Sequence, residues 1–287
     1  MRILVPLLLV PLAAGCAGSV SAPAAVRTPA PALSVAPSPS PSPSSAPSPS
    51  AQPPRATALR TVYYLHDDGR GPRLYREQHR RSATTGVIRD AVTAMLTEKP
   101  VDGDYTSLWP RTTTVRGARL SGTTAYVDLS ADARRGDGGA EAEAMSLQQL
   151  VHTVVAAAPA VKAVQVLVEG KVVPDLWGHV DTSKPIPPGE PSTVLGPVWV
   201  LTSGSIARGG TFGGEATVFE ATVSWEIRQG GQVVQKGFTN ASTGAPGRGT
   251  WSAKADVPPG SYVLRAFESS AEDGRPLWVD DKPLQVR

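Results

Sequence analysis

The stretch at residues 123–129 reads TTAYVDL and decides the fold of the first half of the chain. Ala125, Val127 and Leu129 alternate with polar or aromatic neighbours, so that one face of an extended strand is apolar. A tight turn at Ser121-Gly122 joins this strand to a preceding one at residues 115–120. Because the strand alternates, we expect one of its faces to be buried under helices.

The helices predicted to cover that face lie on both sides of the hairpin in the sequence. One spans about 88–96 and the other about 140–157, each with apolar residues at helical spacing. Thr84 or Thr85 can cap the first helix. Further strands are expected at 61–65, 73–79 and 163–169. The order β-β-α-β-β-α-β predicts a two-layer α/β domain over 58–182, with both helices on one side of a sheet.

After a proline-rich linker at 183–194, the residue pattern predicts strands and turns only. Strands are expected at 198–201, 216–227, 233–238, 251–257, 261–268 and 282–287, and the second of these is expected to alternate over its whole length. The glycine-rich stretch 209–214 is expected to be a flexible turn, because it lacks the lysine of a phosphate-binding loop. Residues 195–287 therefore predict an antiparallel sandwich. The expected fold class is α+β.

The pattern of the N-terminal residues is typical of an export signal followed by a spacer. Arg2 precedes an apolar run that is too short to span a membrane, and small residues follow it up to Cys16. Residues 1–15 are thus predicted to be a signal peptide. Residues 16–57 consist mostly of Ala, Pro and Ser, a composition that favours a disordered, extended tether.

The ending Leu12-Ala13-Ala14-Gly15-Cys16 resembles the lipobox of bacterial lipoproteins, although its leucine stands one place early. The resemblance implies that Cys16 becomes the lipid-modified N-terminus and holds the protein on the outer face of the cell membrane. The alternative is a plain secreted protein with an incidental cysteine near its cleavage site. Cys16 is the only cysteine, so we expect no internal disulfide.

Residues 61–175 resemble the GerMN domain of spore-germination and related envelope lipoproteins. The segments that carry the resemblance are Val62–Leu65, Ile88–Val92, Thr124–Ser130 and Val164–Gly170. The resemblance implies an extracytoplasmic interaction domain, similar to ring-building modules, and it transfers no catalytic residue.

Residues 195–287 resemble the immunoglobulin-like domain of bacterial spore germination, which commonly follows GerMN. Here the resemblance rests on Val218–Val223, Gly249–Ser252, Pro258–Leu264 and Phe267-Glu268.

The charge distribution argues against nucleic acid as a partner and is compatible with an anionic surface. The formal net charge is only +3, and most of the excess lies in the leader and linkers, so we expect no nucleic-acid binding. The one basic cluster surrounds the first predicted hairpin and consists of Arg70, Arg73, Arg76, Arg80 and Arg81. It is a possible contact for anionic lipid headgroups or wall polymers. The alternative is a solvated sheet face.

No residue pattern predicts catalysis, a metal site or a cofactor. The four histidines lack metal-ligand spacing, and His152 is expected on a helix surface. The acidic pairs Glu141/Glu143 and Asp280/Asp281 are explained by helix dipole and solvent exposure. Three tryptophans at alternating strand positions are expected in the core of the sandwich rather than in a carbohydrate site; these are Trp199, Trp225 and Trp251.

The sequence therefore predicts a non-catalytic, lipid-anchored envelope protein. Its expected partners are the membrane, through its anchor, and envelope proteins or wall polymers, with homo-oligomer formation through the GerMN-like domain also possible. Two other classes stay open. A solute- or glycan-binding lipoprotein requires a concave pocket with convergent polar groups. A wall-remodelling hydrolase requires two acids across a cleft.

Overall fold

The computed structural model describes residues 57–83 and 86–287. The chain opens with an antiparallel hairpin of β1 (Thr57–His66) and β2 (Arg73–Ser82). Asp67 builds the turn, because its Oδ1 accepts the backbone N–H of Gly69 at 2.8 Å and of Gly71 at 3.0 Å. This hairpin occupies the positions that the sequence predicted for its first two strands.

Two helices form the middle layer of the first domain. They are α1 (Val87–Thr97) and α2 (Ala140–Ala157), and both agree with the predicted spans. The N-cap of α1 is Gly86, whereas Thr84 and Thr85, which were expected to cap it, lie outside the described residues. Seven of the eleven residues of α1 are buried, so this helix is covered on more than one face.

A four-stranded sheet with the order β3-β4-β5-β6 forms the other layer. Its strands are β3 (Val115–Ser121), β4 (Thr124–Leu129), β5 (Ala163–Val168) and β6 (Lys171–Val172). A short 3-10 helix, η1 (Ala131–Arg135), follows β4. β4 pairs antiparallel with β3 and parallel with β5, because α2 supplies the crossover between β4 and β5. The predicted alternation holds, since Ala125, Val127 and Leu129 are all fully buried.

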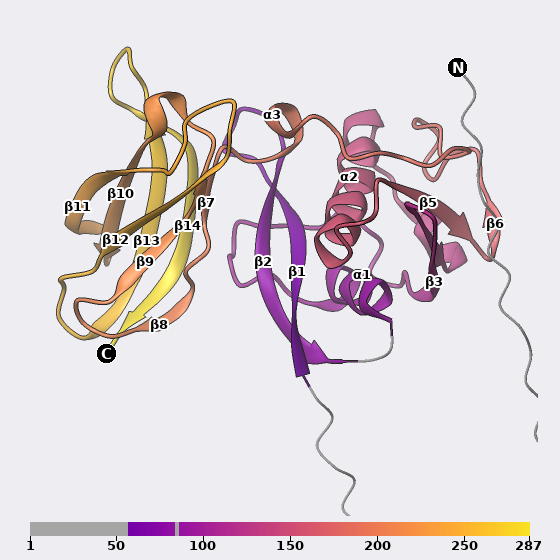
Figure 1. Ribbon diagram of the computed structural model, residues 1–287, viewed down its shortest axis with the longest axis horizontal. Coiled ribbons are helices and arrows are strands. Elements are labelled where there is room, and N and C mark those ends of the chain that lie inside the picture. Colours follow the sequence, from indigo (N-terminus) through magenta and orange to yellow (C-terminus); the bar gives the residue numbers. More distant parts are fainter. Residues whose placement is uncertain (1–56, 84–85) are drawn as a thin grey trace, which may run out of the picture. The chain divides into compact units, whose positions relative to one another are not determined.

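The mixed α/β class of this domain is confirmed, but its strands do not form one sheet. The hairpin β1-β2 is a sheet of its own, and α1 and α2 lie between it and the four-stranded sheet (Figure 1). A helix that is buried on several faces can pack against one sheet on each of its sides. The strands of this domain therefore form two sheets rather than the single predicted one. The sequence pattern shows which residues are apolar and does not show how many sheets the helices separate.

The residues between the domains are packed against the first domain. The backbone of Ile186 pairs with that of Val164 through hydrogen bonds of 2.9 and 2.8 Å. The N–H of Gly189 donates to Oε1 of Gln148 on α2 at 2.7 Å. A single turn of helix, α3 (Pro191–Val194), completes the connection. The proline-rich connection is therefore fixed to the first domain at several points.

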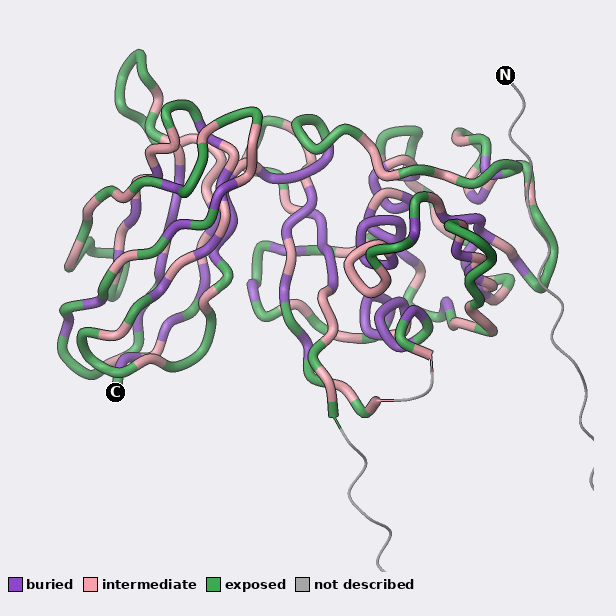
Figure 2. The backbone as a smooth tube through the Cα atoms, in the orientation of Figure 1, coloured by how far each residue is buried: buried purple, intermediate pink, exposed green. Residues whose placement is uncertain are grey.

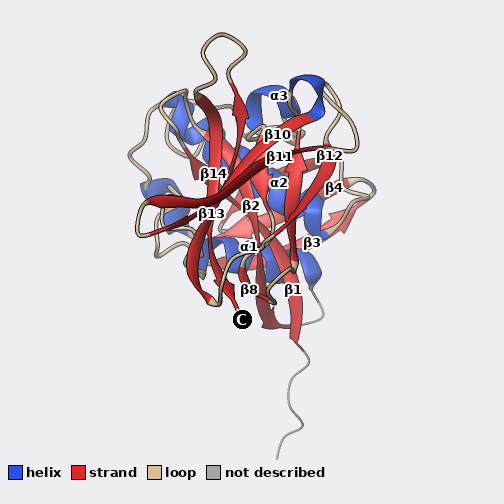
Figure 3. Ribbon diagram, turned by 90° about the vertical axis from the view of Figure 1, so that its left-hand side faces the viewer, coloured by secondary structure: helices blue, strands red, loops and turns tan. Residues whose placement is uncertain are grey.

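The second domain consists of two β-sheets, which confirms the predicted all-β class (Figure 3). One sheet has three strands in the order β12-β9-β7, and the other has five in the order β11-β10-β13-β14-β8. The strands are β7 (Val198–Val200), β8 (Gly204–Ile206), β9 (Thr211–Ala216), β10 (Thr222–Gln229), β11 (Gln232–Asn240), β12 (Gly249–Lys254), β13 (Gly260–Ser269) and β14 (Pro276–Val286).

Two strand predictions in this domain are wrong. The single strand expected at 216–227 is broken by the 3-10 turn η2 (Phe219–Ala221), in which Glu220 and Ala221 adopt positive φ. The break leaves Phe219 exposed, although alternation placed it on the apolar face.

The stretch 209–214, expected as a flexible turn, instead contributes most of β9. A Cβ on Gly214 would lie 1.7 Å from the carbonyl oxygen of Trp199. Glycine is therefore required there by close strand packing.

Most buried apolar residues fall into two clusters, one centred in each domain. Figure 2 shows the buried stretches of the chain in purple. Trp225 and Trp251 belong to the cluster of the second domain, as predicted, and both pack edge-on against Phe212. Trp199 is also buried, but it joins the cluster of the first domain, although it lies on β7 of the second. Its indole N–H donates to the carbonyl of Leu74 on β2 at 3.2 Å. Trp199 therefore links the two domains.

Candidate functional site

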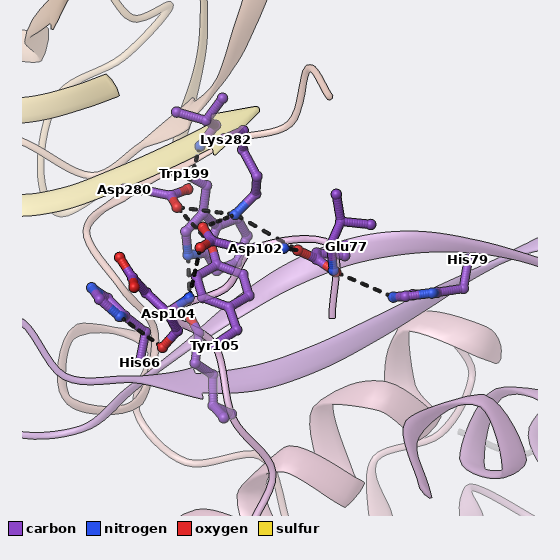
Figure 4. Close-up of polar contacts among 12 residues, drawn as sticks. His66, Glu77, His79, Asp102, Asp104, Tyr105, Trp199, Asp280 and Lys282 are labelled. Carbon is purple, nitrogen blue, oxygen red and sulfur yellow. Dashed lines mark hydrogen bonds and ion pairs between the residues drawn. The ribbon is translucent and has the colours of Figure 1, made fainter. Parts of the chain in front are cut away.

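The main concentration of buried charge lies where the two domains meet, around Lys282 of β14 (Figure 4). Nζ of Lys282 lies 2.8 Å from Asp102 and 3.1 Å from Asp280, and 3.8 Å from Glu77 of β2. It also lies 3.6 Å from the centre of the Tyr105 ring. Burial alone would lower the pKa of Lys282, but Asp280 and Asp102 raise it above its ordinary value. Lys282 is therefore a cation held between carboxylates of both domains.

Asp280 is fixed by three donors from different elements. It accepts hydrogen bonds from the Tyr105 hydroxyl at 2.6 Å, from the backbone N–H of Val200 at 2.6 Å and from Lys282. Burial raises the pKa of Asp280 to about 6, against the opposing effects of Lys282, Tyr105 and Val200. Its carboxylate joins the second domain to the loop after α1 in the first.

Glu77 extends the cluster into the first domain. Its carboxylate accepts the backbone N–H groups of Val101 at 2.8 Å and of Asp102 at 2.9 Å. Its other neighbour is His79, whose Nε2 lies 3.2 Å from Oε2 of Glu77. Burial opposes ionisation of Glu77, but His79, the two amides and Lys282 hold its pKa below the ordinary value. The polar groups of this cluster are thus largely occupied with one another.

Three of the five arginines predicted to contact anionic surfaces lie against residues of the second domain. Arg70 and Arg73 lie over the ring of Trp278, at 5.7 and 5.5 Å from its centre. Arg76 lies 5.2 Å from the centre of the Trp199 ring and forms an ion pair with Glu215. These stacked guanidinium groups form a second set of contacts between the domains.

Trp278 is held in an unusual backbone conformation at the same contact. Its φ is 53°, in the left-handed region that residues other than glycine rarely adopt. Oδ2 of Asp68, in the β1-β2 turn, accepts its backbone N–H at 3.0 Å. The contact with the first domain thus helps to hold this conformation.

The two other arginines of the predicted cluster lie further along the hairpin. Arg81 forms an ion pair with Glu98 and donates to Thr97 at 2.9 Å, and Arg80 is exposed. The structure therefore divides the five arginines between the domain contact and the far end of β2. Cys16, the predicted lipid-attachment residue, lies outside the described residues.

A cavity of about 320 Å³ lies beside the cluster and is lined mainly by charged residues, among them His66, Asp68, Arg70 and Arg265. The carboxylates of Asp102, Asp104 and Asp281 also line it, with one oxygen from each within 4.8 Å of the others. Asp102 is already bound to Lys282, so we assign no metal ligand there. The cavity also lacks the mainly apolar lining of a typical solute-binding pocket.

Two predictions about polar residues on α2 are wrong. His152, expected on the helix surface, is 9% exposed and packs 5.5 Å from the Tyr63 ring, and burial lowers its pKa to about 4. Glu143, expected in solvent, is fully buried. It accepts four backbone N–H groups, those of Leu176, Trp177, His179 and Val180. Solvent exposure does not explain Asp280 either, since it is 2% exposed.

The interdomain cluster was not predicted, although one sequence signal pointed to it. Lys282, Leu284 and Val286 share one face of β14, and the last two are buried in the sandwich core. A lysine in register with core residues requires a buried partner. That signal identifies Lys282, but it does not identify acids that are distant in sequence.

Two family models match the chain. Residues 61–174 match a family described as Germane, sporulation and spore germination. Residues 203–275 match Gmad2, described as an immunoglobulin-like domain of bacterial spore germination. Neither description names a catalytic activity. No protein with a curated description matches the sequence.

Solved structures with similarity to the chain include two from Bacillus subtilis and one from Clostridium perfringens. The first GerMN domain of the Bacillus subtilis sporulation protein GerM is 16% identical over 45% of this chain and 97% of that one, with a TM-score of 0.38. The tandem GerMN domains of GerM are 14% identical over 70% and 62%, with a TM-score of 0.40. A Clostridium perfringens protein classed as a lipoprotein is 18% identical over 46% and 87%, with a TM-score of 0.34. In the part of the chain that the structure describes, no helix is long and apolar enough to cross a membrane.

Proposed function

We propose, for a chain that joins a Germane domain to an immunoglobulin-like domain of the bacterial spore-germination type, a non-catalytic role as an adaptor of the cell envelope. In this role the two domains are presented together to envelope proteins or wall polymers. Cys16 would attach the chain to the outer face of the cell membrane, and residues 16–57 would space the domains from it.

The observation that carries this proposal is that the buried charged residues between the domains pair with one another. Glu77, Asp102, Asp280 and Lys282 are all buried and are paired with one another. Groups committed in this way fix one domain on the other and are not free to meet a substrate. A chain in which buried acids and a buried lysine hold two domains together is suited to presenting the surfaces of both domains to a partner.

The test of the adaptor role is a crosslinked pull-down of the full lipoprotein from native membranes. Recovery of a small set of envelope proteins, or of wall polymer, is the expected result. Recovery of a small solute alone would move the protein to the solute-binding class. Clearing of wall material in a zymogram with the purified chain would contradict the non-catalytic role.

The lipid anchor has its own test in Cys16→Ala. Without the acyl chains the protein loses its hold on the bilayer, because stable anchoring needs more than one acyl chain or signal. We expect the variant to appear in the medium, measured by fractionation and immunoblot. A variant that stays with the membrane would show that Cys16 is not the anchor.

A further inference from the structure

The strand β11 forms one end of the five-stranded sheet and pairs only with β10 among the described strands. Within residues 57–83 and 86–287, no backbone hydrogen bond reaches the side of β11 that faces away from β10. A strand end of this kind offers a row of N–H and C=O groups to another extended chain. Proteins usually protect such edges by shortness, charge, bulges or cover.

The other sheet ends in the described structure are protected in these ways. β6 has two residues, and β7 and β8 have three each. β12 is covered by β11, because Gln235 donates to the carbonyl of Lys254 at 3.1 Å and Thr239 to that of Ser252 at 3.0 Å.

The remaining long edges belong to the first domain and are also protected. β3 has an irregular register, and its Arg116 pairs with Asp128 and Glu169. β2 carries four arginines, and side chains of α2 bond to the backbone of β1 at Tyr63.

The edge at β11 is long and apolar by comparison. It has nine residues and no proline, and Val233, Val234 and Phe238 are 41%, 47% and 75% exposed. Val234 is the extra residue of a bulge against β10, so the regular part of the edge is Gln235–Asn240. Along that part, Lys236 and Phe238 point to the same side of the sheet because they are two residues apart.

Lys236 gives this edge a preferred charge. It lies opposite Glu226, but Glu226 forms its ion pair with Arg228 on its own strand at 3.5 Å. Lys236 is exposed and has no ion pair in the described part of the chain. An added strand would therefore place its side chains beside an unpaired cation and an exposed aromatic ring.

We propose that β11 is a docking edge for an extended segment of another envelope protein, in which acidic and apolar side chains alternate along one face. This inference rests on the adaptor role and specifies the strand used and the chemistry of the partner. Backbone pairing along Gln235–Asn240 supplies the contact, while Lys236 and Phe238 select an acidic residue followed by an apolar one.

The test uses the full chain carrying Cys16→Ser and two labelled peptides, with binding measured by fluorescence anisotropy up to about 1 mM. One peptide reads Thr-Glu-Thr-Val-Thr-Glu-Thr-Val-Thr, and the other has lysine in place of both glutamates. We expect the glutamate peptide to bind several-fold more tightly. No binding of either peptide, or equal binding of both, would overturn the inference.

Three exposed-site variants assign the binding to the edge. Phe238→Ser should weaken binding by about fivefold, the upper range of one cross-strand pair. Lys236→Glu should reverse the preference between the two peptides. Phe219→Ser is the matched control, because Phe219 is 70% exposed in the same domain but lies outside β11, and we expect it to bind within about twofold of the unchanged protein. Equal losses in all three variants would show that the peptide binds elsewhere.

A pull-down separates this inference from the adaptor role. If the full lipoprotein captures envelope proteins and the variant with Lys236→Glu and Phe238→Ser captures the same set, the adaptor role stands and the edge assignment is wrong. Loss of that set in the double variant, with retention in Phe219→Ser, supports the edge. Capture of nothing by the unchanged lipoprotein counts against the adaptor role itself.

Discussion

Replacing Lys282 by methionine tests whether the interdomain cluster holds the fold together. The change keeps an unbranched side chain that is one atom shorter. Among residues 57–83 and 86–287, it removes the only cation within hydrogen-bonding distance of Asp102 and Asp280. Breaking a buried ion pair by removing one partner costs about 3–5 kcal/mol, because the other charge stays buried. Asp280 keeps its bonds from Tyr105 and Val200, so we expect the lower end, a loss of about 3 kcal/mol.

The assay is urea unfolding of the full chain carrying Cys16→Ser, near neutral pH, followed by tryptophan fluorescence. Lys254→Met is the matched control, because Lys254 is exposed on β12, and its loss should stay within about 0.5 kcal/mol. Adding Asp280→Asn to Lys282→Met should recover part of the loss by removing one unpaired charge. A loss below about 1 kcal/mol for Lys282→Met, or one equal to the control, would refute the reasoning, since that is the range of an exposed pair.

Three further changes test single features of the fold by the same unfolding assay. Burial raises the pKa of Asp280 from 3.8 to about 6, so its contribution to stability is full below pH 3.8 and is lost as the pH rises through 6. Asp280→Asn should remove this dependence, and an unchanged pH profile would contradict it. Burial lowers the pKa of His152 from 6.5 to about 4, so its contribution is full above pH 6.5 and is lost as the pH falls toward 4. His152→Gln should therefore change the slope in the opposite direction to Asp280→Asn, and a change of the same sign would show that one assignment is wrong. Gly214→Ala places a methyl group against the Trp199 carbonyl and should cost at least about 2 kcal/mol, whereas Gly139→Ala, with open space around its Cβ, should cost far less; equal costs would exclude the steric explanation.

The elements with local signals were predictable from the sequence. The alternation at residues 123–129 identified β4, and helical spacing of apolar residues located α2 at its observed bounds. These signals follow from periodicity, which is a property of neighbouring residues. The break at η2 has no such signal, because Phe219 and Val223 keep the alternation of a strand while the backbone between them turns.

The errors about polar residues share a different physical cause. Glu143 lies in the first turn of α2, where the helix dipole alone can explain the presence of an acidic residue. Its buried position is set by four backbone amide groups that lie over thirty residues away in the sequence. Asp280 and Tyr105 lie 175 residues apart and meet only because the domains pack together. Partnerships of this kind are tertiary, so a single sequence shows the polar residue and not what it binds.

The fixed connection at residues 183–194 has a consequence for avidity. Ile186 and Gly189 tie that segment to the first domain, and Lys282 and Trp199 tie the second domain to the same body. A partner that touches both domains therefore meets two surfaces whose separation is already set. Its second contact forms without the orientational entropy that two loosely joined modules would lose, so two weak contacts can add up to a durable attachment.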